Sequence, residues 1–390
     1  MHRYPTQRLF FVSATVLAII APWLLLLTLT GQLGLQFTIA AHSKSMLFGF
    51  VGALIAGYLA GKQRLASLLL LYGLWLSGRI LEVFATDELA TGLAYSAFGI
   101  LLALLVAPKF KAAKKWRNRT MMPLIALIGC FPLARETLPL MTDTFEFSNI
   151  SFVLMISTLM YFMGGRLITP SLTRAFAESG LPIVHRVQPQ LEAATLALLF
   201  AAICASLFSA PTGWIASPAI AAALLILFRL YRWNLSKLGS SYSSLWAFVA
   251  GYIWLALGIL AVSFALVLGH PLQSGIHIIT IGALGTLSST VILRFCVANT
   301  DSSRHWYYSS ILLLAGATAI RYSVNLLPEN ATGLLFTSAC LWSLNFAVIL
   351  FGACRRKLQD RPCRNQRETI TNNPANLNCR VNSESSTGRQ

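Results

Sequence analysis

The side chains best placed to do chemistry in this chain are a few ionisable residues inside or beside long apolar segments. Such groups are costly to hold in an apolar environment, so they are candidates for function. Imidazole is the commonest metal ligand, and two imidazoles from separate segments can hold a haem iron from opposite faces. His42 and His277 are therefore candidate ligands. Arg79 and Arg321 can each bind an anion, such as phosphate, a carboxylate or a haem propionate.

The same four residues also have simpler interpretations. An arginine one or two turns inside a membrane segment can extend its head group to the interface, and an interfacial histidine need not bind anything. Glu82 lies three residues after Arg79, so the two side chains can also pair along one helix. Composition alone leaves these interpretations open.

Long apolar segments must position these residues, because the chain is 56% apolar and only 11% charged. Soluble proteins carry about 25% charged residues, so this composition excludes a soluble protein. Apolar runs of about 20 residues are typical of helices that cross a bilayer, and continuous rather than alternating runs exclude transmembrane β-strands. The sequence predicts an all-α polytopic membrane bundle of about twelve helices. The expected spans are 9–30, 45–61, 65–84, 89–107, 120–140, 148–168, 190–209, 213–229, 244–268, 276–297, 307–326 and 331–353.

The basic residues indicate the orientation of this bundle. When the loops are assigned alternately to two sides, 26 of the 30 lysines and arginines fall on the side of the N-terminus. Cytoplasmic loops carry such an excess, so we expect a multi-pass membrane protein with both termini in the cytoplasm. The net charge of +17 is then attracted to anionic lipid rather than to nucleic acid.

A change of composition divides the chain near its end. Residues 1–354 form the expected membrane domain, with His42 just before the second span and His277 at the start of the tenth. Residues 355–390 are polar and basic, which is typical of a disordered cytoplasmic tail. The chain has no P-loop, no G-x-S-x-G motif and no Cys/His spacing suited to zinc, so nothing favours a conventional nucleotide-binding or hydrolytic enzyme.

Six short motifs in chain order resemble those of the NnrS family of polytopic bacterial inner-membrane proteins. The matches are His42-Ser-Lys-Ser-Met-Leu-Phe-Gly-Phe50, Leu74-Trp-Leu-Ser-Gly-Arg79, Gly164-Gly-Arg-Leu-Ile-Thr-Pro170, Gly251-Tyr-Ile-Trp-Leu-Ala-Leu-Gly258, His277-x-x-Thr-x-Gly-Ala-Leu-Gly-Thr286 leading to Arg294, and Arg321. They extend over roughly residues 8–353. The resemblance implies a haem- and copper-containing membrane protein linked to nitric oxide metabolism and relief of nitrosative stress.

The sequence departs from the family pattern at several expected ligand positions. Lys44, Val249 and Asn299 stand where the family has histidines, and a protonated lysine has no lone pair for a metal. Copper needs several imidazoles or thiolates, so these replacements argue against copper. The resemblance then implies a single haem between His42 and His277. Its propionates would be neutralised by Arg79 and Arg321, with Lys44 able to assist, and its ligand would be a small gas.

Two other functions remain open from the sequence. The cluster of arginine and histidine near the outer face also suits a secondary transporter of a small anion, a class in which twelve spans are common. A family member that has lost its cofactor and serves in the assembly of another membrane complex is the third possibility. A haem absorption band separates the first function from the other two.

Overall fold

The computed structural model describes residues 3–34, 37–84, 87–112, 119–142, 144–183, 185–297 and 303–371. These residues form a helical bundle and one short antiparallel pair of strands, β1 (Tyr4–Pro5) and β2 (Lys62–Gln63). The helices of the first half are α1 (Gln7–Leu29), α2 (Ile39–Lys44), η1 (Ser45–Phe50), α3 (Val51–Leu59), α4 (Leu65–Phe84), α5 (Glu88–Lys111), α7 (Met121–Thr137), η2 (Leu138–Leu140) and α8 (Asn149–Glu178). Those of the second half are α9 (Pro189–Leu207), α10 (Thr212–Tyr231), η3 (Leu235–Lys237), α11 (Ser243–Leu268), α12 (Gln273–His277), η4 (Ile278–Gly285), α13 (Thr286–Ile292), η5 (Leu293–Val297), α14 (Ser303–Ser323), η6 (Pro328–Asn330) and α15 (Ala331–Thr371).

The predicted all-α membrane bundle is confirmed. In the described part of the chain, eleven helical segments are long and apolar enough to cross a membrane. The remaining predicted span, 307–326, corresponds to α14, which is less apolar because it carries Arg304 near its start and Arg321 near its end. Helix α14 nevertheless packs against α11 and α15 within the bundle. We therefore treat it as the twelfth span.

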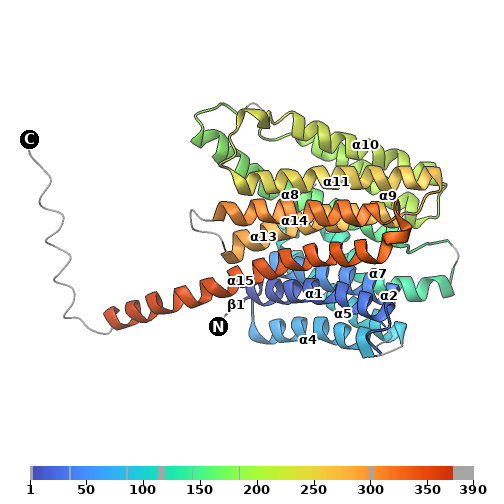
Figure 1. Ribbon diagram of the computed structural model, residues 1–390, viewed down its shortest axis with the longest axis horizontal. Coiled ribbons are helices and arrows are strands. Elements are labelled where there is room, and N and C mark those ends of the chain that lie inside the picture. Colours follow the sequence, from blue (N-terminus) through green and yellow to red (C-terminus); the bar gives the residue numbers. More distant parts are fainter. Residues whose placement is uncertain are drawn as a thin grey trace, which may run out of the picture.

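The last helix joins the two halves of the bundle. In Figure 1, α10 and α11 lie on one side, α1 and α4 lie on the other, and α14 and α15 lie between them. Helix α15 packs against both α14 and α1. Its Trp342 donates a hydrogen bond to the Ala18 carbonyl of α1 at 2.8 Å, and Trp23 of α1 donates to Ser343 at 2.9 Å. Helices α1, α14 and α15 thereby come together around α2 and α12.

Two helical spans begin earlier than the sequence predicts. The second span was predicted from residue 45, but α2 begins at Ile39 because the Thr38 side chain accepts a hydrogen bond from the Ala41 amide at 3.1 Å. A threonine in this role is a typical N-cap. Likewise, α12 begins at Gln273 rather than at 276. His42 and His277 are therefore inside helical segments, which fixes their side chains more tightly than a loop would.

Helix α15 continues to Thr371 and so enters the segment predicted to be a tail. In Figure 1 its last turns project beyond the other helices. Residues 372–390 lie outside the described residues. The domain boundary at residue 354 stays a prediction.

Two glycines of α11 let the helix that carries His277 approach closely. A Cβ atom added at Gly258 would lie 2.4 Å from Cγ1 and 2.9 Å from the backbone nitrogen of Ile279, and one at Gly251 would lie 2.6 Å from Cδ2 of Leu287. Small residues at such crossings allow membrane helices to pack by their backbones. The Gly251 to Gly258 motif thus has a packing role next to the candidate site.

We expect Gly258→Ala to lower the thermal unfolding midpoint of the detergent-purified protein. The added methyl group must push η4 away from α11, and overpacking of this kind costs about 1–3 kcal/mol. The matched control is Gly73→Ala in α4, where a Cβ atom meets nothing within 4 Å. Alanine there should leave the midpoint unchanged or raise it, because it favours the helix. Equal midpoints for the two variants would contradict the close packing of η4 on α11.

Candidate functional site

A cavity of about 400 Å³ lies between the C-terminal end of α1, the segments α2–η1 and α12–η4, and helices α14 and α15. Its size is within the range of pockets that hold small molecules and cofactors. His42, His277 and Arg321 all line it, on three different segments of the chain. Most of the other lining residues are apolar, and those described include no carboxylate. The structure therefore brings three of the four predicted site residues to one cavity.

The ring of His277 is oriented by its own helix. Its Nδ1 atom lies 2.6 Å from the carbonyl oxygen of Gln273, one turn earlier. The carbonyl can only accept, so Nδ1 carries the proton and Nε2 keeps its lone pair. Histidines that bind metals commonly donate their other ring nitrogen to a carbonyl in this way. In the neutral ring this contact favours the tautomer whose Nε2 atom is available to a metal.

The ring of His42 has an unsatisfied nitrogen. Its Nδ1 atom is buried and forms no hydrogen bond that meets the distance and angle limits among the described residues, although the Ala21 backbone lies close enough to act on the ring. Leaving a buried polar atom unpaired costs about 1–3 kcal/mol, and such atoms are rare in folded proteins. His42 itself lines the cavity, so its ring can contact a ligand there.

Irregular helix geometry follows both histidines. The π-helical turn η4 begins at Ile278, directly after His277, and the π-helical turn η1 begins at Ser45, three residues after His42. Turns of this type are rare and occur frequently at functional sites. Both candidate ligands therefore stand at the start of a locally distorted helix.

Arg321 provides positive charge to the cavity. It reaches the cavity from α14, and its charge acts on both histidine rings. Since no described lining residue is acidic, nothing inside the cavity neutralises this guanidinium. An anionic group on a ligand would be stabilised there.

Arg79 lies outside the cavity, on the other side of η1. Its Nη1 atom donates to the carbonyl of Ser45 at 3.2 Å, and its guanidinium stacks over the ring of Tyr95 at 4.3 Å. Glycine at position 49 makes room for it, because a Cβ atom there would lie 2.0 Å from Nη1. The Glu82 carboxylate accepts a hydrogen bond from the Tyr95 hydroxyl at 2.8 Å. Tyr95 therefore lies between Glu82 and the Arg79 guanidinium. Arg79 therefore contacts η1 on the side that faces away from the cavity.

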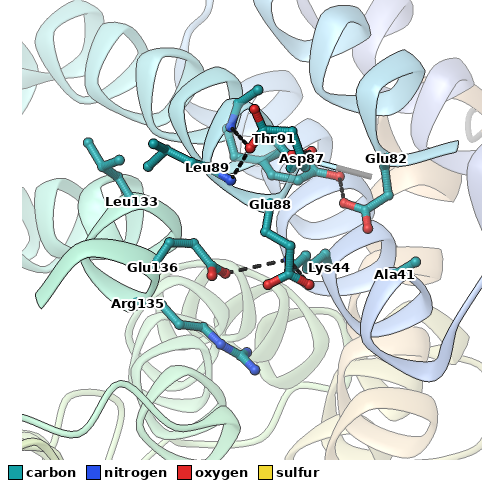
Figure 2. Close-up of polar contacts among 12 residues, drawn as sticks. Ala41, Lys44, Glu82, Asp87, Glu88, Leu89, Thr91, Leu133, Arg135 and Glu136 are labelled. Carbon is teal, nitrogen blue, oxygen red and sulfur yellow. Dashed lines mark hydrogen bonds and ion pairs between the residues drawn. The ribbon is translucent and has the colours of Figure 1, made fainter. Parts of the chain in front are cut away.

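Lys44 also points away from the cavity and contacts two carboxylates. Its Nζ atom lies 3.4 Å from an oxygen of Glu88 and 3.4 Å from an oxygen of Glu136 (Figure 2). The lysine side chain is 9% exposed, the Glu136 side chain 18% and the Glu88 side chain 65%. This three-residue cluster, which we call the Lys44 clamp, ties α2 to α5 and α7. The assistance to a propionate that the sequence suggested for Lys44 has no support from this placement.

The two glutamates of the clamp were not predicted as partners of Lys44 from the sequence. The sequence does contain a signal for this contact, because Glu88 and Glu136 lie near the ends of predicted spans on the same predicted side as Lys44. A buried lysine needs a counter-charge, and these acidic residues can provide it. Of the other replaced ligand positions, Val249 is buried in α11 and Asn299 lies outside the described residues. Within the described residues, no group of three or more His, Cys, Asp or Glu side chains is arranged to hold a metal ion.

Comparison with known proteins gives one match that covers most of the chain. A family model described as NnrS protein matches residues 7–359. No curated protein and no solved structure matches the chain significantly.

Proposed function

Because the chain belongs to the NnrS family, we propose that it is a haem-binding protein of the bacterial inner membrane that acts in nitric oxide metabolism or the response to nitrosative stress. The observation that carries the proposal is the cavity that His42, His277 and Arg321 share. These residues fit a haem: two imidazoles on separate helices for the iron, one guanidinium for a propionate, and apolar walls for the macrocycle.

Each residue has a distinct part in this proposal. His277, oriented by the Gln273 carbonyl, and His42, which lines the cavity from α2, would hold the iron. Arg321 would bind a propionate, whereas Arg79 would act only by supporting η1. A bound haem would supply an iron centre, and a small gas such as nitric oxide could bind it only in place of one of the two imidazoles. The apolar walls would exclude water from that iron.

The test is the absorption spectrum and iron content of the full-length protein, purified in detergent after expression with added haem precursor. We expect a Soret band and about one haem per chain. Protein that is folded and contains no haem would contradict the proposal. Saturable binding of a small anion by the haem-free protein would then favour the transporter, and no binding would favour the assembly role.

The orientation in the membrane is part of the proposal. The charge asymmetry of the loops supports both termini inside, with the histidine cavity in the outer half of the membrane. A reporter that is active only in the periplasm should be silent at the C-terminus and active when inserted between residues 144 and 147. The control is the same reporter inserted in the 185–188 loop, which should also be silent. The reverse pattern would contradict the orientation.

A further inference from the structure

A second pocket lies at the opposite end of the bundle from the histidine cavity. Its volume is about 600 Å³, and four cationic side chains line it: Arg3, Lys62, Arg64 and Lys109. They come from the start of the chain, from the turn between α3 and α4, and from the end of α5. The lining residues include no aspartate or glutamate. The pocket therefore concentrates positive charge without an internal counter-charge.

The pocket is built from an ordered turn rather than from a loose loop. Strand β1 pairs with β2, with Tyr4 opposite Gln63 and Pro5 opposite Lys62. Thr6 is completely buried, and both its amide, at 2.9 Å, and its hydroxyl, at 2.8 Å, donate to the carbonyl of Gly61. Gly61 has a φ of +71°, a conformation that glycine adopts without strain. These contacts hold the cations of two distant segments beside one another.

Lys109 closes the same turn from α5. Its Nζ atom donates to the Leu59 carbonyl at 2.6 Å, at the end of α3. This bond satisfies a helix-end carbonyl and at the same time fixes the ammonium group at the wall of the pocket. Lys109 therefore has a structural role in addition to its charge.

The remaining pocket cations differ from other basic residues at this end of the bundle. Arg174 pairs with Glu178 at 2.6 Å, Arg304 donates to Ser240 at 2.8 Å, and Arg232 contacts His185. By contrast, the side chains of Arg3, Lys62 and Arg64 at the pocket form no hydrogen bond or ion pair with the described residues.

One wall of the pocket is apolar and leads to the lipid-facing surface. Leu105 and Pro108 of α5 line the pocket. Beside them, Leu104 is 65% exposed, and Leu65 and Leu69 at the start of α4 are 49% and 60% exposed. A ligand that suits both surfaces has an anionic head and apolar chains.

We propose that the pocket formed by Arg3, Lys62, Arg64 and Lys109 binds the phosphodiester headgroup of an anionic phospholipid, whose acyl chains lie along α4 and α5. Basic pockets between helices on the cytoplasmic side of membrane proteins bind such headgroups. Guanidinium and ammonium groups provide charge-assisted hydrogen bonds to phosphate oxygens. The proposal concerns a different site from the histidine cavity and does not depend on haem.

The test is native mass spectrometry of the full-length protein in detergent, titrated separately with phosphatidylglycerol, cardiolipin, zwitterionic phosphatidylcholine and inorganic phosphate. We expect phosphatidylglycerol and cardiolipin to bind at concentrations at which phosphatidylcholine and inorganic phosphate do not bind. The variant Arg3→Gln/Lys62→Gln/Arg64→Gln should lose on the order of a hundredfold in affinity, since each cation near a membrane surface contributes about fivefold. Lys109 is left unchanged because of its structural bond.

The matched control removes the same charge elsewhere on the same face, by Arg174→Gln/Arg186→Gln/Lys237→Gln. It should retain the anionic lipid with at most a few-fold loss. An equal loss of lipid affinity in both triple variants would show that the lipid is attracted by the charge of the whole surface. That result would overturn the proposal. Binding of inorganic phosphate as tight as that of the lipids would show a free-anion site and would also overturn it. Melting midpoints equal to that of the wild-type protein in both triple variants exclude misfolding as the cause.

Discussion

The variants His42→Ala and His277→Ala are each expected to abolish or strongly shift the Soret band of the protein. Each removes one imidazole from the cavity, and the iron is then left to water or to a weaker donor. Replacing a residue that merely orients a metal ligand lowers the affinity for the metal by about 10–100-fold. Because the histidines would bind the iron directly, we expect haem content to fall by roughly tenfold or more. The measurement is the visible absorption spectrum together with haem per chain.

Two controls separate ligation from general damage. His270→Ala should have a wild-type spectrum, because His270 is exposed at the same end of the bundle and does not line the cavity. Arg321→Ala should lower haem retention without changing the positions of the absorption bands, since a guanidinium pairs with a propionate but does not coordinate iron. An unchanged spectrum in both His42→Ala and His277→Ala would refute the bis-histidine proposal.

The variant Lys44→Met is expected to destabilise the protein strongly. It keeps the length of the side chain but leaves Glu88 and Glu136 facing one another without their shared cation. Breaking a fully buried ion pair costs about 3–5 kcal/mol, and we expect a loss on the order of 2 kcal/mol here because Glu88 is largely exposed. The thermal unfolding midpoint in detergent measures the effect.

Charge neutralisation distinguishes the clamp from simple packing. Glu136→Gln in the Lys44→Met background should recover part of the stability, because it removes the carboxylate that lost its partner. Lys62→Met serves as the control, since Lys62 is exposed and has no carboxylate partner among the described residues. A Lys44→Met protein that unfolds at the wild-type midpoint would show that the clamp contributes no stability.

Most of the fold could be predicted from the sequence, because it depends on apolar length alone. Each run of about 20 apolar residues became a helix, including the weaker ones interrupted by proline. The start of α2 could not be placed, because capping by Thr38 is a local hydrogen bond that an apolar count does not register. Irregular turns such as η1 and η4 leave no pattern in hydropathy either.

The candidate site was only partly accessible to sequence reasoning. The spans predicted that His42, His277 and Arg321 share one end of the bundle, but only three-dimensional packing places them around one cavity. Arg79 sits at a similar depth, yet the rotation of α4 directs it to Tyr95 instead. Depth follows from residue number, whereas direction depends on how each helix is rotated against its neighbours. The contacts of Lys44 were hidden for the same reason.

Each π-helical turn contains one residue more than an α-helical turn would need, so the helix before it is out of phase with the helix after it. One residue of α-helix corresponds to about 100° of rotation. The directions of His42 and His277 are thereby set independently of the faces that α3 and α13 pack against the core. Both histidines can therefore line the cavity while α3 and α13 keep their buried residues in the core.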